Sequence, residues 1–163
     1  MKRAKPVSAS KTILSMQMLP VDANPMGNVH GGTILKLVDT SAAVAALLHA
    51  RTNIVSASID RMDFYRPVYV GDLLILKACV NYSGRTSMEV GVRIEAENLK
   101  TGKVTHTGSS YVTYVALDEK GRPTPVPQAI PETAEEKRRW REGKERREQR
   151  IKERARRSAK GKS

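Results

Sequence analysis

Apolar residues recur at helical spacing between residues 31 and 50. One face of this segment carries Ile34, Leu37, Val38, Ser41, Ala45 and Leu48, and Leu35, Ala42 and Ala46 add small or apolar groups beside it. A helix that is apolar over most of its circumference has to be buried. The pattern therefore predicts one long core helix over residues 31–50.

Alternation of apolar and polar residues marks the strands. Every second side chain from Met88 to Ala96 is apolar, which is the period of a half-buried strand. Further strands are predicted at 11–19, 54–60, 74–82 and 104–117, with turns at 83–85 and 100–102. One buried helix followed by hairpin-linked strands predicts an α+β fold, in which an antiparallel sheet of about five strands curls around the helix.

A cluster of four prolines between residues 123 and 131 marks a change of composition. Proline removes a backbone donor and disfavours helix in the residue before it. We therefore place a boundary here, with one domain over residues 1–130 and a charged C-terminal tail over residues 131–163.

The tail has the pattern of a charged helix. Thr133 followed by Glu136 is a capping box, and acidic and basic residues recur one helical turn apart after it. Apart from Trp140 and Ile151 the helix has almost no apolar face. Three arrangements stay open: the tail helix is solvated, it docks weakly through Trp140, or it frays and is partly disordered.

The net charge of +12 raises the question of a nucleic-acid partner. The tail carries +7 of this charge, but acidic residues alternate with the basic ones and blunt the field. Of the seven aromatic residues only Trp140 lies in the tail. The composition therefore disfavours nucleic-acid binding through the tail, which stays an alternative function.

The single cysteine, Cys79, excludes a disulfide framework within the chain and a zinc site built from paired cysteines. A reducing, cytoplasmic location is expected. The longest uninterrupted apolar run, residues 42–48, falls far short of the roughly 18 residues of a membrane span. No cluster of His, Cys and carboxylate residues has the spacing of metal ligands, so no metal is expected.

Two features near the core helix could carry chemistry. Gly31 and Gly32 at its start leave backbone N–H groups open to a ligand oxygen, which is an oxyanion site in outline, although glycines also relieve strain in an ordinary tight loop. Asp39 lies two turns into an apolar helix, where a carboxylate needs either a function or a partner. Thr40, Ser41 or a backbone group of another strand could be that partner.

The same residues form part of a resemblance that covers nearly all of residues 10–118. The chain resembles the hot-dog acyl-CoA thioesterases, specifically the bacterial YciA-like and the brain-type acyl-CoA hydrolases. The resemblance rests on motifs that occur in order: Asn24 and Gly27-Asn28-Val29-His30-Gly31-Gly32, then Asp39, then Ser56-Ala57-Ser58-Ile59-Asp60, then Phe64, Pro67-Val68 and Gly71-Asp72, and finally Gly84-Arg85-Thr86-Ser87-Met88-Glu89-Val90.

The resemblance implies a hot-dog fold and hydrolysis of acyl-CoA to a free acid and CoA, at sites shared between two subunits. It implies that Asp39 acts as general base or nucleophile and that Asn24 comes from the opposing subunit. The amide of Gly32, beside Gly31, would polarise the thioester carbonyl, in agreement with the helix-dipole argument.

The resemblance also implies where CoA binds. The turn Gly84, Arg85, Thr86, Ser87 and Met88 would lie along CoA, with Arg85 available for a phosphate, and Ser58 would belong to the substrate site. A solvated hairpin turn is the alternative. No cofactor is implied beyond the CoA of the substrate, and the expected assembly is a dimer at least and a hexamer of three dimers by resemblance.

Some features fall outside the family pattern. The basic tail is longer and more charged than the resemblance requires. His30 takes a position that can be aromatic or apolar in the family and is expected to pack against the acyl channel, and His49 and Cys79 are best interpreted as structural. A non-hydrolytic acyl-CoA sensor on the same fold remains an alternative function. The presence of Asp39 and Asn24 disfavours it, because loss of either group would be expected in a sensor.

Overall fold

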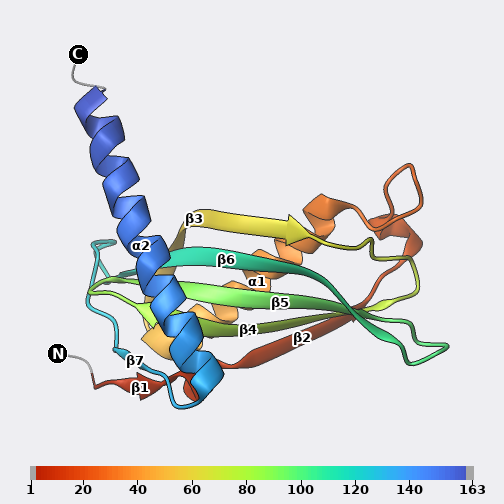
Figure 1. Cartoon of the computed structure of the whole chain (residues 1–163), viewed down its shortest axis with the longest axis horizontal. Coiled ribbons are helices and arrows are strands. Elements are labelled where there is room, and N and C mark those ends of the chain that lie inside the picture. The colour runs from red at the N-terminus through yellow and green to blue at the C-terminus, as the bar shows by residue number, and fades with distance from the viewer. Residues whose placement is uncertain (1–2, 161–163) are drawn as a thin grey trace.

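The central element of the fold is the core helix. In the computed structural model, which describes residues 3–160, helix α1 spans Gly31–Ala50, as the apolar pattern predicts. Arg51 ends it in the left-handed conformation, with φ of 52°. By length and composition α1 could cross a bilayer. One side of it is instead covered by the sheet and forms the core (Figure 1).

Five strands form one antiparallel sheet, in the order β2-β4-β5-β6-β3. Their bounds are β2 Thr12–Gln17, β3 Asn53–Phe64, β4 Leu73–Ser83, β5 Ser87–Glu97 and β6 Val104–Leu117. The short segments are β1 Lys5–Pro6 paired with β7 Ala129–Ile130, and the single turns η1 Val7–Ser10 and η2 Pro20–Asp22. The predicted α+β architecture is confirmed.

One connection differs from the expected run of hairpins. β4, β5 and β6 are hairpin neighbours, whereas β3 pairs with β6 and β4 pairs with β2. Between β3 and β4 the chain therefore crosses from the β3 edge of the sheet to the strand beside the opposite edge, β2. This leaves β3 as an edge strand, directly after the helix in sequence.

The alternating strands place their apolar side chains against α1. Leu74, Leu76, Val80 and Val90 are fully buried, as are Val38 and Ala42 of the helix among others. Burial of each large aliphatic side chain contributes about 1.5–3 kcal/mol to folding. The apolar faces of β4 and β5 are thus buried against α1, as the alternation predicts.

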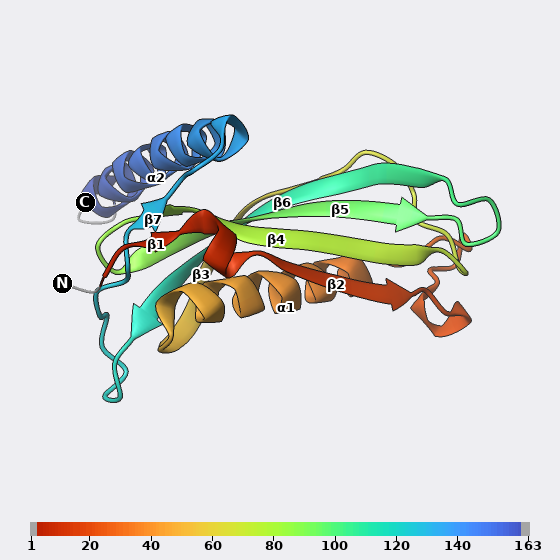
Figure 2. The same ribbon diagram turned by 90° about the horizontal axis from the view of Figure 1, so that it is seen from below.

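The charged tail forms a long helix on the opposite face of the sheet. Helix α2 spans Ala134–Lys160 and lies across that face, with α1 on the other side (Figure 2). The capping box is confirmed, because Thr133 Oγ1 accepts from Glu136 N (3.2 Å) and Glu136 Oε2 accepts from Thr133 N (3.2 Å). Trp140 contacts Tyr82 edge to face, with ring centroids 5.2 Å apart. Of the three arrangements considered, α2 therefore docks.

Ion pairs hold α2 as much as Trp140 does. Arg146 binds Glu89 of β5 through two hydrogen bonds, of 2.9 and 2.7 Å, and its guanidinium lies 3.9 Å from the Tyr111 ring centroid. Arg150, one turn later, pairs with Asp60 of β3. Glu89 is only 1% exposed. Alternation alone places Glu89 in solvent, and the charged contact face of α2 covers it.

The first turn of α2 is anchored by a carboxylate to Lys11, the residue before β2. Lys11 Nζ lies 2.7 Å from Glu136 Oε1, and the backbone N–H groups of Glu132 and Thr133 donate to Glu136 Oε2. The Lys11 hydrogen bond, with these amides, holds the pKa of Glu136 at about 2. Because the folded pKa lies below the ordinary value, the ionised form stabilises the docked helix above about pH 4.5, and this stability is lost as the pH falls towards 2.

We therefore expect Glu136→Gln to lower the free energy of unfolding near neutral pH, and the difference from the native chain to shrink between pH 4.5 and pH 3. Trp140 is the only tryptophan and lies on α2, so its fluorescence reports the docking. Glu135→Gln is the matched control, since that exposed pair should contribute less than about 1 kcal/mol. A difference that stays constant across this pH range would contradict the assignment.

Candidate active site

The loop before α1 is shaped by Asn24. Its Oδ1 accepts hydrogen bonds from the N–H groups of Met26 (2.9 Å) and Asn28 (3.2 Å), and Gly27 between them has φ of +85°. Asn24, Gly31 and Phe64 line an open pocket of about 310 Å³ at the helix start. The structure thus places Asn24 beside the N-terminus of α1.

The two glycine amides at the helix start differ. Gly32 N donates to Nδ1 of His30, the N-cap residue, at 2.9 Å. Gly31 N makes no hydrogen bond within the described part of the chain. The predicted oxyanion donor, Gly32, is therefore already occupied by a side chain of its own loop, and Gly31 presents the open amide. Both glycine amides lie at the positive end of the helix dipole.

Asp39 is half-buried rather than enclosed in the core. Its Oδ1 accepts hydrogen bonds from the hydroxyls of Tyr114 (2.8 Å) and Ser56 (3.2 Å). Its Oδ2 accepts none from the residues that the structure describes. One oxygen of the carboxylate is therefore fixed, and the other is free to act on a ligand or a water molecule.

The partners of Asp39 are not those that the sequence suggested. The Thr40 hydroxyl donates to Lys36 O at 3.0 Å, and Ser41 Oγ is buried with no hydrogen-bond partner among the described residues. Tyr114, from β6, also approaches the backbone oxygen of Asp39 at 2.9 Å. Burial, and then the Asp39 carboxylate, raise the pKa of the Tyr114 hydroxyl. Tyr114 therefore stays protonated and can serve as a hydrogen-bond donor.

Ser58 is not brought to Asp39. Its hydroxyl donates to Asp60 Oδ1 at 2.6 Å, and Asp60 also binds Thr113 and Arg150 under α2. A bulge between Ser56 and Ser58 puts these two residues opposite Tyr114 and Thr113 respectively. In a regular strand both serines would share one face. Here Ser56 faces Asp39, and Ser58 belongs to the network beneath α2.

The predicted CoA turn joins β4 to β5 at the far end of the sheet from the Asn24 loop (Figure 1). Its carbonyls are occupied: Gly84 O accepts from Gln128, Arg85 O from Val126 and Thr86 O from Ala116. Arg85 is exposed, and Thr86 and Ser87 are half-buried. Met88 is 1% exposed and packs in the core, so its side chain is not available to a ligand.

The site residues thus form separate groups in one protomer. Asp39 does not line the pocket of Asn24 and Gly31, and the turn at Arg85 lies at the other end of the sheet. Tyr114 is the site residue that the sequence did not single out, and Ser56 stood in a motif of the resemblance without a role in the site. An aromatic residue in the predicted strand 104–117 was the only signal for Tyr114, since nothing in the sequence aligns it with the helix.

Comparison with known proteins settles the family. Residues 26–103 match the family model of the thioesterase superfamily. YkhA of Bacillus subtilis, described as an uncharacterised acyl-CoA thioester hydrolase, is 38% identical over 127 residues, which are 78% of this chain and 74% of that protein. The chain belongs to the thioesterase superfamily. The rat cytosolic acyl coenzyme A thioester hydrolase is 37% identical over 85% of this chain and 37% of its own length.

Solved structures of this superfamily extend the likeness to the whole fold. An apo-hexameric acyl-CoA thioesterase is 46% identical, with a TM-score of 0.90 over 94% of this chain and 98% of that one. An acyl-CoA hydrolase of Staphylococcus aureus, solved with butyryl coenzyme A and coenzyme A, is 36% identical, with a TM-score of 0.90 over 98% and 97% of the two chains. The predicted hot-dog fold is confirmed.

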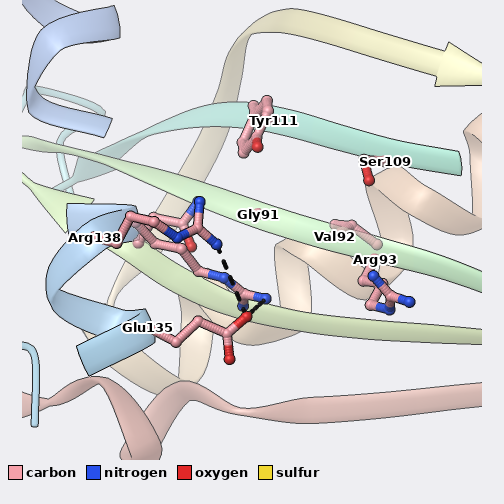
Figure 3. Close-up of a pocket in the computed structure, with 9 residues that line it drawn as sticks. Gly91, Val92, Arg93, Ser109, Tyr111, Glu135 and Arg138 are labelled. Carbon is pink, nitrogen blue, oxygen red and sulfur yellow. Dashed lines mark hydrogen bonds and ion pairs between the residues drawn. The ribbon is translucent and has the colours of Figure 1, made fainter. Parts of the chain in front are cut away.

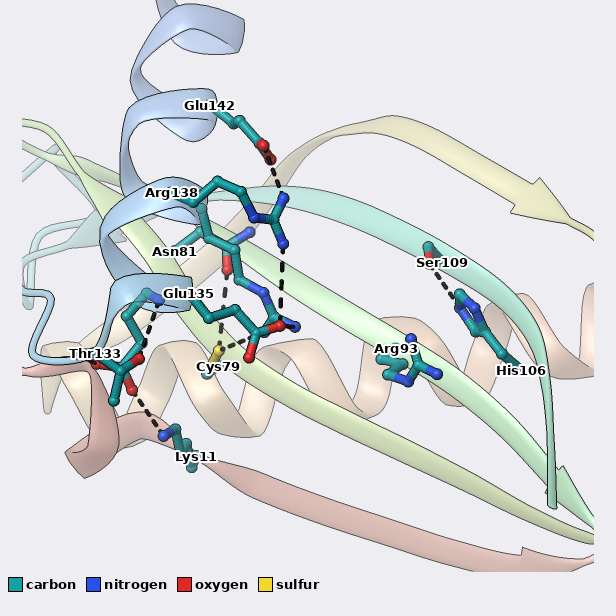
Figure 4. A network of polar contacts seen from close by, with 12 residues as sticks. Lys11, Cys79, Asn81, Arg93, His106, Ser109, Thr133, Glu135, Arg138 and Glu142 are labelled. Atoms are coloured by element: carbon teal, nitrogen blue, oxygen red, sulfur yellow. Dashed lines mark hydrogen bonds and ion pairs between the residues drawn. The ribbon is translucent and has the colours of Figure 1, made fainter.

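This thioesterase chain has a second, more polar pocket on the face away from α1. It measures about 180 Å³ and lies between α2 and strands β4 to β6, with Arg93 and Tyr111 on the sheet side and Arg138 on the helix side (Figure 3). Arg138 is paired with Glu142 (Figure 4). Arg93 is paired with Glu95. These cations are already satisfied, and the pocket is separated from Asp39 by the sheet.

His49 and Cys79 also lie apart from the thioesterase site. His49 is buried near the end of α1 with Nε2 3.0 Å from Pro127 O, and burial lowers its pKa. Burial raises the pKa of the Cys79 thiol. Among the residues that the structure describes, no three His, Cys, Asp or Glu side chains are grouped to hold a metal ion.

Proposed function

We propose that this protein hydrolyses acyl-CoA thioesters to a free carboxylic acid and CoA. The observation that carries the proposal is the Asp39 carboxylate, which is oriented by Tyr114 and Ser56 and keeps Oδ2 unpartnered. A carboxylate held in this way can take a proton from water or attack the thioester carbon itself. The names of the relatives describe the same chemistry.

The spacing of residues in the Staphylococcus aureus relative supports the same assignment. Alanine variants of that enzyme were solved at an aspartate, at an asparagine 15 positions before it and at a threonine 17 positions after it. In this chain Asn24 precedes Asp39 by 15 positions and Ser56 follows it by 17. We therefore assign Ser56, rather than Ser58, to the site.

The developing negative charge on the thioester oxygen requires hydrogen-bond donors. The open amide of Gly31, at the positive end of α1, meets this need. The N–H of Gly32 becomes a second donor when its hydrogen bond to His30 Nδ1 is broken. At the other end of the substrate, Arg85 and the exposed part of its turn suit the phosphates of CoA. No cofactor is needed for this reaction, since CoA is part of the substrate and a product.

A complete site requires a second copy of the chain. Asn24 and Gly31 line one pocket and Asp39 lies outside it, so we propose that Asn24 of one protomer serves Asp39 of another. Val44 and Leu47 of α1 and Val55 and Ile59 of β3 are exposed apolar residues on adjoining elements, and burial of such a patch favours dimerisation through this side. A hexamer of three dimers and a cytoplasmic location remain predictions.

The decisive experiment is a hydrolysis screen over acyl-CoA esters of increasing chain length, with detection of the free thiol. We expect turnover with at least one chain length. Tight binding of acyl-CoA without release of thiol would identify a sensor instead. Nucleic-acid binding through α2 has no comparable support, because none of the relatives is named as a nucleic-acid-binding protein and Arg138, Arg146 and Arg150 are paired with carboxylates.

Tyr114→Phe tests the positioning of the carboxylate. The variant loses one hydrogen bond to a charged group, worth about 1.5–3 kcal/mol, so kcat should fall by roughly 10-fold to 100-fold while KM changes little. Tyr82→Phe, on the opposite face of the sheet, is the control and should keep the native kcat. Equal kcat values in the two variants would remove Tyr114 from the site.

A further inference from the structure

Helix α2 contacts the predicted CoA turn through Arg147. A Cβ atom built on Gly84 would lie 2.8 Å from Arg147 Nε and 3.2 Å from its Cζ and Nη2. Gly84 has no positive φ, so backbone conformation does not require a glycine at this position. The guanidinium lies directly against the turn, so a side chain at position 84 would have to displace it.

Arg147 differs from Arg146 and Arg150 in having no carboxylate partner. Arg146 binds Glu89 and Arg150 binds Asp60, whereas Arg147 is half-buried and has no carboxylate within 4.0 Å among the described residues. A guanidinium carries five donors and no acceptor. A half-buried cation with no carboxylate partner in the described part of its chain is therefore suited to an anion from outside.

The turn beside Arg147 offers further donors of the same kind. Arg85 is exposed and likewise has no ion pair within the described chain. The N–H groups of Arg85 and Thr86 donate to no group in residues 3–160, although the carbonyls of both residues accept hydrogen bonds. One turn thus carries or contacts two arginines and two amides without an acceptor among the described residues, which is the composition of a phosphate site.

We propose that Arg147 and Arg85 together bind a phosphate of the CoA nucleotide, so that the C-terminal helix forms part of the substrate site. The proposal rests on the proposed function and extends it from the turn at Arg85 to α2. The charged tail thereby gains a specific role, because the ion pairs of Arg146 and Arg150, on either side, fix the stretch of helix that presents Arg147. The acyl end of the substrate lies outside this contact.

The test compares Arg147→Ala with Arg154→Ala on two substrates, an acyl-CoA and the acyl-pantetheine with the same acyl group. Arg154 is the matched control, because it lies seven positions later on the same helix, is exposed and carries the same charge. For Arg147→Ala we expect KM for acyl-CoA to rise roughly 10-fold or more, with kcat at saturation unchanged. Kinetics with acyl-pantetheine, which has no nucleotide phosphate, should match the native enzyme, and Arg154→Ala should match it on both substrates.

Other results would overturn the inference. An equal loss on both substrates would show that Arg147 only packs against the turn. If KM is unchanged in Arg147→Ala and raised in Arg85→Ala, the turn binds CoA without a contribution from α2. If KM is unchanged in both variants, neither the turn nor α2 binds the phosphate. If neither thioester is hydrolysed, the proposed reaction is wrong. The phosphate site is then tested by calorimetric titration with CoA itself. Arg147→Ala should lose most of its affinity for CoA, and Arg154→Ala should lose none.

Discussion

Asp39→Asn should lower kcat by about 10² to 10⁴, the typical range for loss of a general base. The amide can still accept the hydrogen bonds of Tyr114 and Ser56 at Oδ1, so the local structure should persist. What it lacks is the negative charge that removes a proton from water or attacks the thioester. Because the residue acts on the reacting atoms and does not hold the substrate, KM should change little.

The measurement is steady-state release of thiol from a substrate found in the chain-length screen. Asp118→Asn is the control, since that carboxylate lies in the exposed loop after β6 and accepts backbone hydrogen bonds that an amide also accepts. It should keep the native rate. Near-native kcat in Asp39→Asn, with the native oligomer size, would show that Asp39 is not catalytic.

Mixing two inactive variants should restore activity. In a dimer of one Asn24→Ala chain and one Asp39→Asn chain, one of the two sites receives an intact Asn24 and an intact Asp39 and the other receives neither. Random pairing makes half of the dimers mixed, so a co-expressed preparation should reach about a quarter of the native activity. Each parent alone should be nearly inactive.

The control is co-expression of Asp39→Asn with Asp39→Ala. Both chains then lack the same group, and no arrangement of subunits produces an intact site. Mass spectrometry of the intact assembly verifies that mixed dimers are present. Verified mixed dimers of Asn24→Ala and Asp39→Asn without any recovery would place Asn24 and Asp39 of one chain in the same site.

The fold could be predicted because the patterns of the core are local. Helix α1 has the bounds that its apolar spacing indicates, and the buried side chains of β4 and β5 include the apolar residues that alternate in the sequence. The docking of α2 could not be predicted in this way. Glu89 alternates with apolar residues as a solvent-facing side chain would, and Arg146 lies in a helix without an apolar face. Only the fold shows that these two polar surfaces cover one another.

The candidate site was predictable in its main residues and not in their partners. Asp39 is conspicuous as a carboxylate in an apolar helix, and the resemblance supplied a role for it and for Asn24. Tyr114, by contrast, lies 75 positions from Asp39, and only the pairing of strands brings it there. The choice between Ser56 and Ser58 depends on one bulge in β3, which the period of the sequence does not reveal.

The position of β3 has a practical consequence for variants that weaken assembly. In a single protomer this 12-residue strand is an edge, and it carries exposed Val55 and Ile59. An unpaired edge strand with apolar side chains can pair with strands of other chains and cause aggregation. Proteins prevent this with charged residues or proline in the edge strand, or by covering the strand with another segment. A second copy of the chain would provide that coverage. Variants that disturb this side are therefore expected to aggregate rather than to yield soluble monomers, and loss of soluble protein would itself report the interface.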